Sequence, residues 1–143
     1  MSLRGIDTTG GDFERIWRDI EEFENWLLAH PDQRDRLPEI YVPGTEIHGQ
    51  TDSLLADLVE REAIMIVADY EVLGVELVDR PDPDTAIVHY TDTRSHREVI
   101  EVASGAVLER EEYEDQPWSW ELRLERSDRG SWRISSIEFL EDV

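Results

Sequence analysis

The chain has 143 residues, of which 39% are hydrophobic and 34% charged, and its 35 acidic and 14 basic residues give a formal net charge of −21. That length suits one domain with one core, and five tryptophans, four tyrosines and three phenylalanines argue against global disorder. The negative charge opposes binding to nucleic acid or to an anionic membrane, because both need a positive surface. With no cysteine, a disulfide scaffold and a thiolate metal site are excluded.

The charge itself has three interpretations. All 14 basic residues are arginine, and acidic, lysine-poor chains are typical of salt-rich cells and of GC-rich genomes. The acidic residues are scattered along the whole chain, which favours this habitat interpretation. The alternatives are an acidic face for a basic partner, and mimicry of nucleic acid toward a DNA-binding protein.

The first predicted element is a helix over residues 13–29, after a flexible leader over residues 1–11. Asp12 is placed to cap this helix, and Pro31 to end it. Apolar residues recur at spacings of three, four and seven, which places one stripe against a core. That stripe consists of Phe13, Ile16, Trp17, Ile20, Phe23, Trp26 and Leu27.

A polar connection with three prolines covers residues 31–50, and a second helix is predicted over residues 52–66. Thr51 or Asp52 would cap this second helix. Its apolar inner face consists of Leu54, Leu55, Leu58, Val59 and Met65.

From about residue 67 the apolar period changes to two, which is typical of strands. Residues 70–78 predict a strand whose alternation slips at Leu73 and Gly74, as at a β-bulge. Then come a turn at 81–84, a strand over 86–93, a hairpin of 98–103 and 106–112, and strands over 118–125 and 132–140.

Helices first and strands grouped after them predict an α+β domain with an antiparallel sheet. We expect a single domain over residues 12–143. Its architecture would be two or three N-terminal helices packed on a curved antiparallel sheet of five or six strands, a cystatin-like roll.

Three segments carry a family resemblance. They are Phe13-Glu14-Arg15-Ile16-Trp17 in the first helix, Tyr70-Glu71-Val72-Leu73-Gly74-Val75-Glu76-Leu77 in the first predicted strand, and Asp128-Arg129-Gly130-Ser131-Trp132-Arg133-Ile134-Ser135 near the end. On these the chain resembles the nuclear transport factor 2-like superfamily over roughly residues 12–140. This superfamily of cone-shaped α+β rolls includes ketosteroid isomerases and small SnoaL-like polyketide cyclases, and the chain looks closest to its non-catalytic accessory branch.

The resemblance implies a ligand pocket in the cone between the helices and the sheet. The aromatic residues expected to line it are Trp17, Trp26, Tyr70, Tyr90, Trp118 and Trp120. Catalytic members place a carboxylate base and acidic hydrogen-bond donors in the cone, and the candidates here are Asp69, His89 and Tyr90. Strand alternation puts His89 and Tyr90 on opposite faces, and no residue here matches the isomerase base.

We therefore expect a non-catalytic binding or accessory domain that presents its cone or its sheet face to a small apolar ligand or to a protein. One alternative is an isomerase, dehydratase or cyclase that uses the cone, and another is an acidic mimic or inhibitor of a basic partner. The resemblance also implies that a homodimer could form through the sheet, because sheets of this family often pair, with Trp118 and Trp120 serving either the core or the interface.

No histidine pair has zinc-ligand spacing, so neither a metal nor a cofactor is expected. Apolar runs stay well below the roughly 20 residues that span a bilayer, so membrane insertion is not expected. The compartment is left open: cytoplasmic on the chain as given, or exported where a signal or anchor precedes it.

Overall fold

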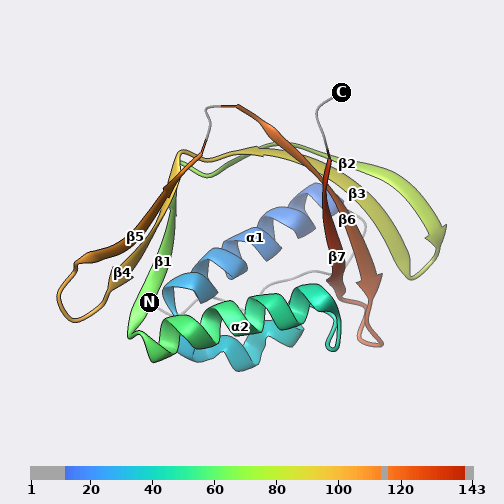
Figure 1. Ribbon diagram of the computed structural model, residues 1–143. Helices are drawn as coiled ribbons and strands as arrows, with labels where there is room; N and C mark the ends of the chain where they lie inside the picture. The colour runs from blue at the N-terminus through green and yellow to red at the C-terminus, as the bar shows by residue number, and fades with distance from the viewer. Residues whose placement is uncertain (1–11, 114–115, 141–143) are drawn as a thin grey trace.

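The computed structural model describes residues 12–113 and 116–140, so the leader predicted over residues 1–11 lies outside the described residues. The helices are α1 (Phe13–Ala29), η1 (Pro31–Glu39) and α2 (Glu46–Glu60). The strands are β1 (Ala63–Ala68), β2 (Glu71–Asp82), β3 (Thr85–Thr93), β4 (His96–Glu101), β5 (Val107–Glu112), β6 (Trp118–Arg126) and β7 (Trp132–Leu140). Figure 1 shows the strands arched over α1, with α2 below it. The α+β prediction is confirmed, with seven strands in the described part rather than five or six.

Helix α1 has the bounds that its apolar spacing predicts. The Asp12 carboxylate caps it by accepting a hydrogen bond from the amide of Arg15 at 3.2 Å. The predicted stripe is buried except for Trp26, which is half-buried, and its most enclosed members are Ile16, Trp17, Ile20 and Phe23. Burial of this one face holds the helix against the sheets.

The predicted bounds of the second helix are wrong at both ends. Helix α2 begins at Glu46, because the hydroxyl of Thr45 caps it by accepting from the amide of His48 at 3.3 Å. It ends at Glu60, and Glu62 follows with a φ of 51°, outside the helical region. Part of the expected polar connection, Pro31–Glu39, winds into the 3-10 helix η1.

The tail of that predicted helix is strand β1. Its residues pair antiparallel with β4, and Met65 lies opposite Val99. The segment reads Ala-Ile-Met-Ile-Val-Ala, and its β-branched side chains fit a pleated surface better than a helix.

The strands form two antiparallel sheets with the orders β1-β4-β5 and β2-β3-β6-β7. The chain passes from β3 into β4 through Arg94 and Ser95, so one sheet leads directly into the other. Figure 1 shows the sheets as two wings of an arch whose concave side faces α1. The predicted β-bulge is confirmed, because the register of β2 on β3 shifts between Val72 and Gly74.

The core lies between α1 and the concave side of this arch. Its largest fully buried side chains include Trp17, Phe23, Tyr41 and Trp132. The connection between η1 and α2 is joined to β7 by two backbone hydrogen bonds. The Ile134 amide donates to the Ile40 carbonyl at 2.7 Å, and the Val42 amide donates to the Ile134 carbonyl at 2.9 Å.

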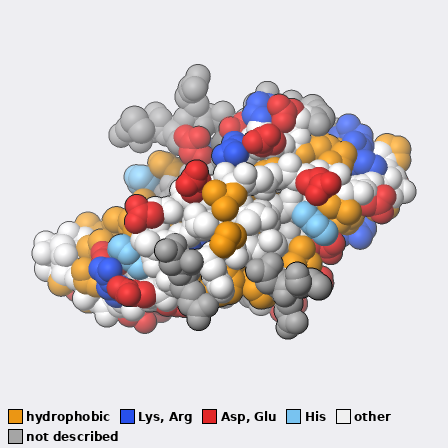
Figure 2. All heavy atoms as spheres, turned by 90° about the horizontal axis from the view of Figure 1, so that it is seen from above, with side chains coloured by type: hydrophobic (Ala, Val, Ile, Leu, Met, Phe, Trp, Pro, Cys, Tyr) orange, Lys and Arg blue, Asp and Glu red, His pale blue; other side chains and the backbone are white. Residues whose placement is uncertain are grey.

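Charged side chains are spread over the surface. On the face seen in Figure 2, acidic and basic groups alternate with apolar ones instead of gathering by sign. Several arginines bridge separate elements by ion pairs, such as Arg34 with Asp52 at 2.7 Å and Arg61 with Glu109 at 2.6 Å. None of the described helices has the length and apolar character needed to cross a bilayer.

Candidate functional site

A cavity of about 250 Å³ opens inside the cone. Every layer of the fold contributes to its wall: α1, α2, β1, β3, β4, β6 and β7. The apolar part of the wall consists of Leu28, Ile47, Leu54, Met65, Val67 and Ile137. The polar and aromatic part consists of Glu21, Glu24, Asn25, Thr51, Tyr70, Tyr90, Arg94, Arg97, Tyr113 and Trp120. An apolar hollow with a few converging polar groups is the usual form of a small-molecule site.

Two carboxyl groups enter this cavity from α1. Glu21 and Glu24 are three residues apart, so they lie on the same side of the helix, and both are half-buried. Burial, and then the neighbouring Glu24 charge, raise the pKa of Glu21 well above its usual range. Burial also raises the pKa of Glu24, although the Tyr41 hydroxyl donates to its carboxylate at 2.5 Å and opposes that rise.

An ion pair joins Asp92 of β3 to Arg94, which follows β3 and lies in the cavity wall. Asp92 is 0% exposed, and it accepts from the Arg94 guanidinium at 2.7 Å and from the Trp120 indole at 3.1 Å. Burial lowers the pKa of Arg94, but the charge and hydrogen bond of Asp92 outweigh that and keep the pKa above its ordinary value. The Arg94 guanidinium also lies over the rings of Tyr70 and Tyr113, 5.3 and 5.4 Å from their centroids.

Two tyrosines complete the polar wall. The Tyr70 hydroxyl is buried and makes no hydrogen bond of good geometry to a described residue, although it lies near enough to Glu21 to lower the pKa of that carboxyl group. Burial, and then the Glu21 charge, raise the pKa values of Tyr70 and Tyr90 far above their usual range. Both phenols therefore stay protonated at neutral pH, so they can serve as hydrogen-bond donors to a ligand.

The six aromatic residues expected in the pocket fall into three groups. Tyr70, Tyr90 and Trp120 line the cavity. Trp17 packs behind it, fully buried, with its ring 4.4 Å from that of Tyr90. Trp26 stacks on Phe23 and His30, and Trp118 packs against Phe139, so neither lies in the cavity wall.

The three catalytic candidates are not brought together. Tyr90 faces the cavity. His89 lies on the other face of β3, where its Nε2 is 2.9 Å from Glu121 on β6. Asp69 is exposed with a φ of 53°, and its carboxylate accepts from the Ser95 hydroxyl at 2.9 Å. The carboxyl groups that do enter the cone, Glu21 and Glu24, were not among the candidates.

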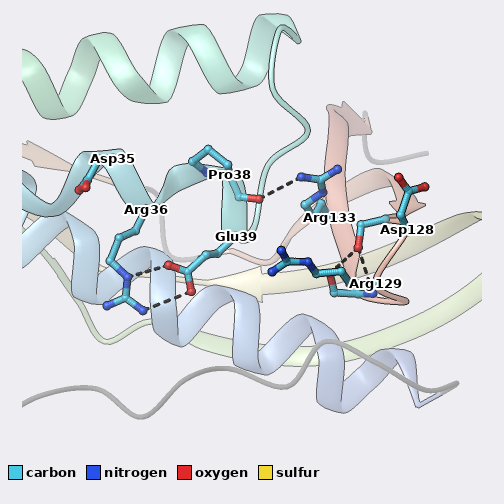
Figure 3. Close-up of a pocket in the computed structure, with 9 residues that line it drawn as sticks. Asp35, Arg36, Pro38, Glu39, Asp128, Arg129 and Arg133 are labelled. Carbon is cyan, nitrogen blue, oxygen red and sulfur yellow. Dashed lines mark hydrogen bonds and ion pairs between the residues drawn. The ribbon is translucent and has the colours of Figure 1, made fainter.

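A larger hollow of about 510 Å³ lies between η1 and the turn joining β6 to β7. Figure 3 shows two of its arginines directed at protein partners: Arg36 pairs with Glu39, and Arg133 donates to the Pro38 carbonyl at 3.2 Å. Most of its lining residues are exposed, so it is a surface groove rather than an enclosed site. Among residues 12–113 and 116–140 no set of three or more potential ligands is arranged to hold a metal ion.

No family model and no curated protein matches the chain. Solved structures do resemble its fold. The intermembrane space region of the chloroplast protein ARC6 superposes with a TM-score of 0.60 at 11% identity, covering 91% of this chain and 95% of that one. Aln2 from a Streptomyces species superposes with a TM-score of 0.55 at 13% identity, covering 93% of both chains. At such identities the likeness establishes the fold alone. The function of this chain therefore has to be inferred from the residues of the site.

Proposed function

We propose that this chain is a ligand-binding domain of the nuclear transport factor 2-like kind, and that its cone holds a small molecule with an apolar body. The observation that carries the proposal is the cavity of about 250 Å³, walled by apolar and aromatic side chains with Tyr70, Glu21 and Glu24 among them. The fold likeness to Aln2 and to the ARC6 region supports the same class. Because that class hosts both binders and enzymes, the cavity rather than the fold supports the function.

The sheet face is a weaker candidate for the binding surface. Val88 and Leu122 are 0% exposed on the concave side, so alternation puts the intervening His89 and Glu121 on the convex side. Glu138 of β7 lies opposite Glu121 in the register, which places two like charges side by side. At these positions the convex face offers little apolar area for a homodimer or a protein partner.

General acid catalysis in the cone is a second candidate function. The raised pKa of Glu21 favours it, because burial lets this carboxyl group hold a proton, and donate it to a substrate, at a higher pH than an exposed glutamate does. Any compound found to bind would be followed by NMR for conversion by the wild type and by the Glu21→Gln variant. Conversion that Glu21→Gln abolishes would favour an enzyme, and binding without conversion would favour a binding domain.

The test of the proposal is a screen of small aromatic and alicyclic compounds by ligand-observed NMR, with a variant that fills the cone. Thr51 lies in the cavity wall, while its neighbour Gln50 is exposed on the same helix. We expect Thr51→Trp to abolish binding and Gln50→Trp to leave it unchanged. Compounds that bind both variants equally, or a screen without any binder, would refute a ligand site in the cone.

A further inference from the structure

The cone carries more carboxyl groups than cations available to pair with them. Arg94 is bonded to Asp92 at 2.7 Å, and Arg97 pairs with Glu111 at 2.6 Å. Glu21 and Glu24 therefore enter the cavity without an ion pair to any described residue. Phenols are their hydrogen-bonding neighbours in the protein wall: the Tyr41 hydroxyl donates to Glu24, and the Tyr70 hydroxyl lies near Glu21. The Arg94 charge acts on both carboxyl groups without forming an ion pair to either.

The rest of the wall suits a cation with an apolar body. Tyr90 and Trp120 present nearly parallel rings, with centroids 6.3 Å apart and planes 15° from parallel. A cation already lies against aromatic rings at this site, because the Arg94 guanidinium sits over Tyr70 and Tyr113. The buried Tyr70 hydroxyl in the same wall adds a polar group that makes no hydrogen bond of good geometry to a described residue.

We propose that the ligand of the cone is a small organic ammonium ion, whose cationic head lies between Glu21 and Glu24 and whose aromatic or alicyclic body lies against Tyr90 and Trp120. This inference rests on the proposed function of the cone as a ligand site. A monovalent ammonium group offsets the mutual repulsion of the two carboxylates and donates hydrogen bonds to both. A neutral ligand of the same shape gains only the contacts of its body.

The experiment compares two probes of nearly equal shape, phenethylamine and 2-phenylethanol, by isothermal titration calorimetry at 0.15 M salt. We expect the wild type to bind the amine at least tenfold more tightly than the alcohol. The double variant Glu21→Gln/Glu24→Gln should lose that preference and keep its affinity for the alcohol. The control Glu22→Gln/Glu60→Gln removes the same charge at two exposed sites and should retain the preference.

Three results would overturn the inference: equal affinities of the wild type for both probes, a preference that survives in Glu21→Gln/Glu24→Gln, or equal loss of preference in the control. The last two would assign the effect to the net charge of the chain. Equal affinities would leave the ligand site itself intact, since the alcohol binds. If neither probe binds while the compound screen finds neutral ligands excluded by Thr51→Trp, the ammonium inference fails and the proposed function stands. The wild-type comparison does not depend on whether any variant folds.

Discussion

Substituting Asp92 tests how much its ion pair with Arg94 at the cavity wall contributes to stability. Asp92→Ala removes the acceptor of the Arg94 guanidinium and of the Trp120 indole together. A hydrogen bond to a charged group contributes about 1.5–3 kcal/mol and a neutral one about 1 kcal/mol. The Arg94 side chain is 23% exposed, so water partly solvates the guanidinium that is left behind. We therefore expect a loss of about 3 kcal/mol, at the low end for a broken buried pair.

One further variant separates the parts of this loss, and a second is a control at an exposed pair. Asp92→Asn keeps an acceptor for the indole but removes the charge, and should cost about 2 kcal/mol. Glu121→Ala breaks the His89–Glu121 contact on the convex face, where both side chains are more than one-third exposed. That exposed pair should contribute no more than about 1 kcal/mol.

The assay is urea unfolding at pH 7 and constant salt, followed by tryptophan fluorescence and far-ultraviolet circular dichroism, with the free energy of unfolding taken from midpoint and slope. Urea is uncharged, so it leaves the electrostatics of a chain of charge −21 in place. The reasoning is refuted if Asp92→Ala costs less than about 1 kcal/mol, or if Glu121→Ala costs as much as Asp92→Ala.

Four other measurements follow from the structure. Trp17→Ala should lose about 3–5 kcal/mol in the same urea assay, because the indole is fully buried; a loss under about 1 kcal/mol would contradict its place in the core. Glu21→Gln should stabilise the protein at pH 8 and less so as the pH falls toward 4, because the folded-state pKa of Glu21 is raised and stability is lost as pH rises above the unfolded value; a pH-independent effect would disprove this. Gly130→Ala should cost about 1 kcal/mol, since Gly130 has a φ of +83°, whereas Gly49→Ala inside α2 should stabilise by about 0.5–1 kcal/mol; effects of the same sign would contradict the backbone argument. Raising sodium chloride from 0.1 to 1 M should raise the urea midpoint, because salt screens the repulsion within a chain of charge −21; an unchanged midpoint would show that the charge costs little stability.

The elements with long, regular patterns could be predicted from the sequence. Helix α1 and strand β7 have the predicted bounds, and the β2 bulge lies at the predicted slip. Strand β1 could not be predicted, because a run of six apolar residues after a helix continues the helical pattern as well as it starts a strand. The deciding feature is the positive φ of Glu62, which depends on the fold rather than on the residue type.

The cone carboxyl groups could have been found from spacing. Trp17, Glu21, Glu24 and Leu28 follow each other at intervals of four, three and four, which is one line along a helix. Trp17 and Leu28 are buried at the two ends of that line, so the acids between them face the interior of the cone. Treating acidic residues as surface groups hides this signal, because the fold places them beside a cavity rather than in solvent.

The hydrogen bonds between Ile40, Val42 and Ile134 have a consequence for how the chain reaches its native state. They close a segment of more than ninety residues, and closing a flexible loop of that length costs about 4 kcal/mol of chain entropy. During synthesis the apolar stripe of α1 is complete long before β7 leaves the ribosome, so Phe13 at the start of that stripe stays without Trp132 of β7, whose ring lies 5.2 Å from its own in the native fold. Late closure of this kind favours slow folding and gives a chaperone time to act on the exposed stripe.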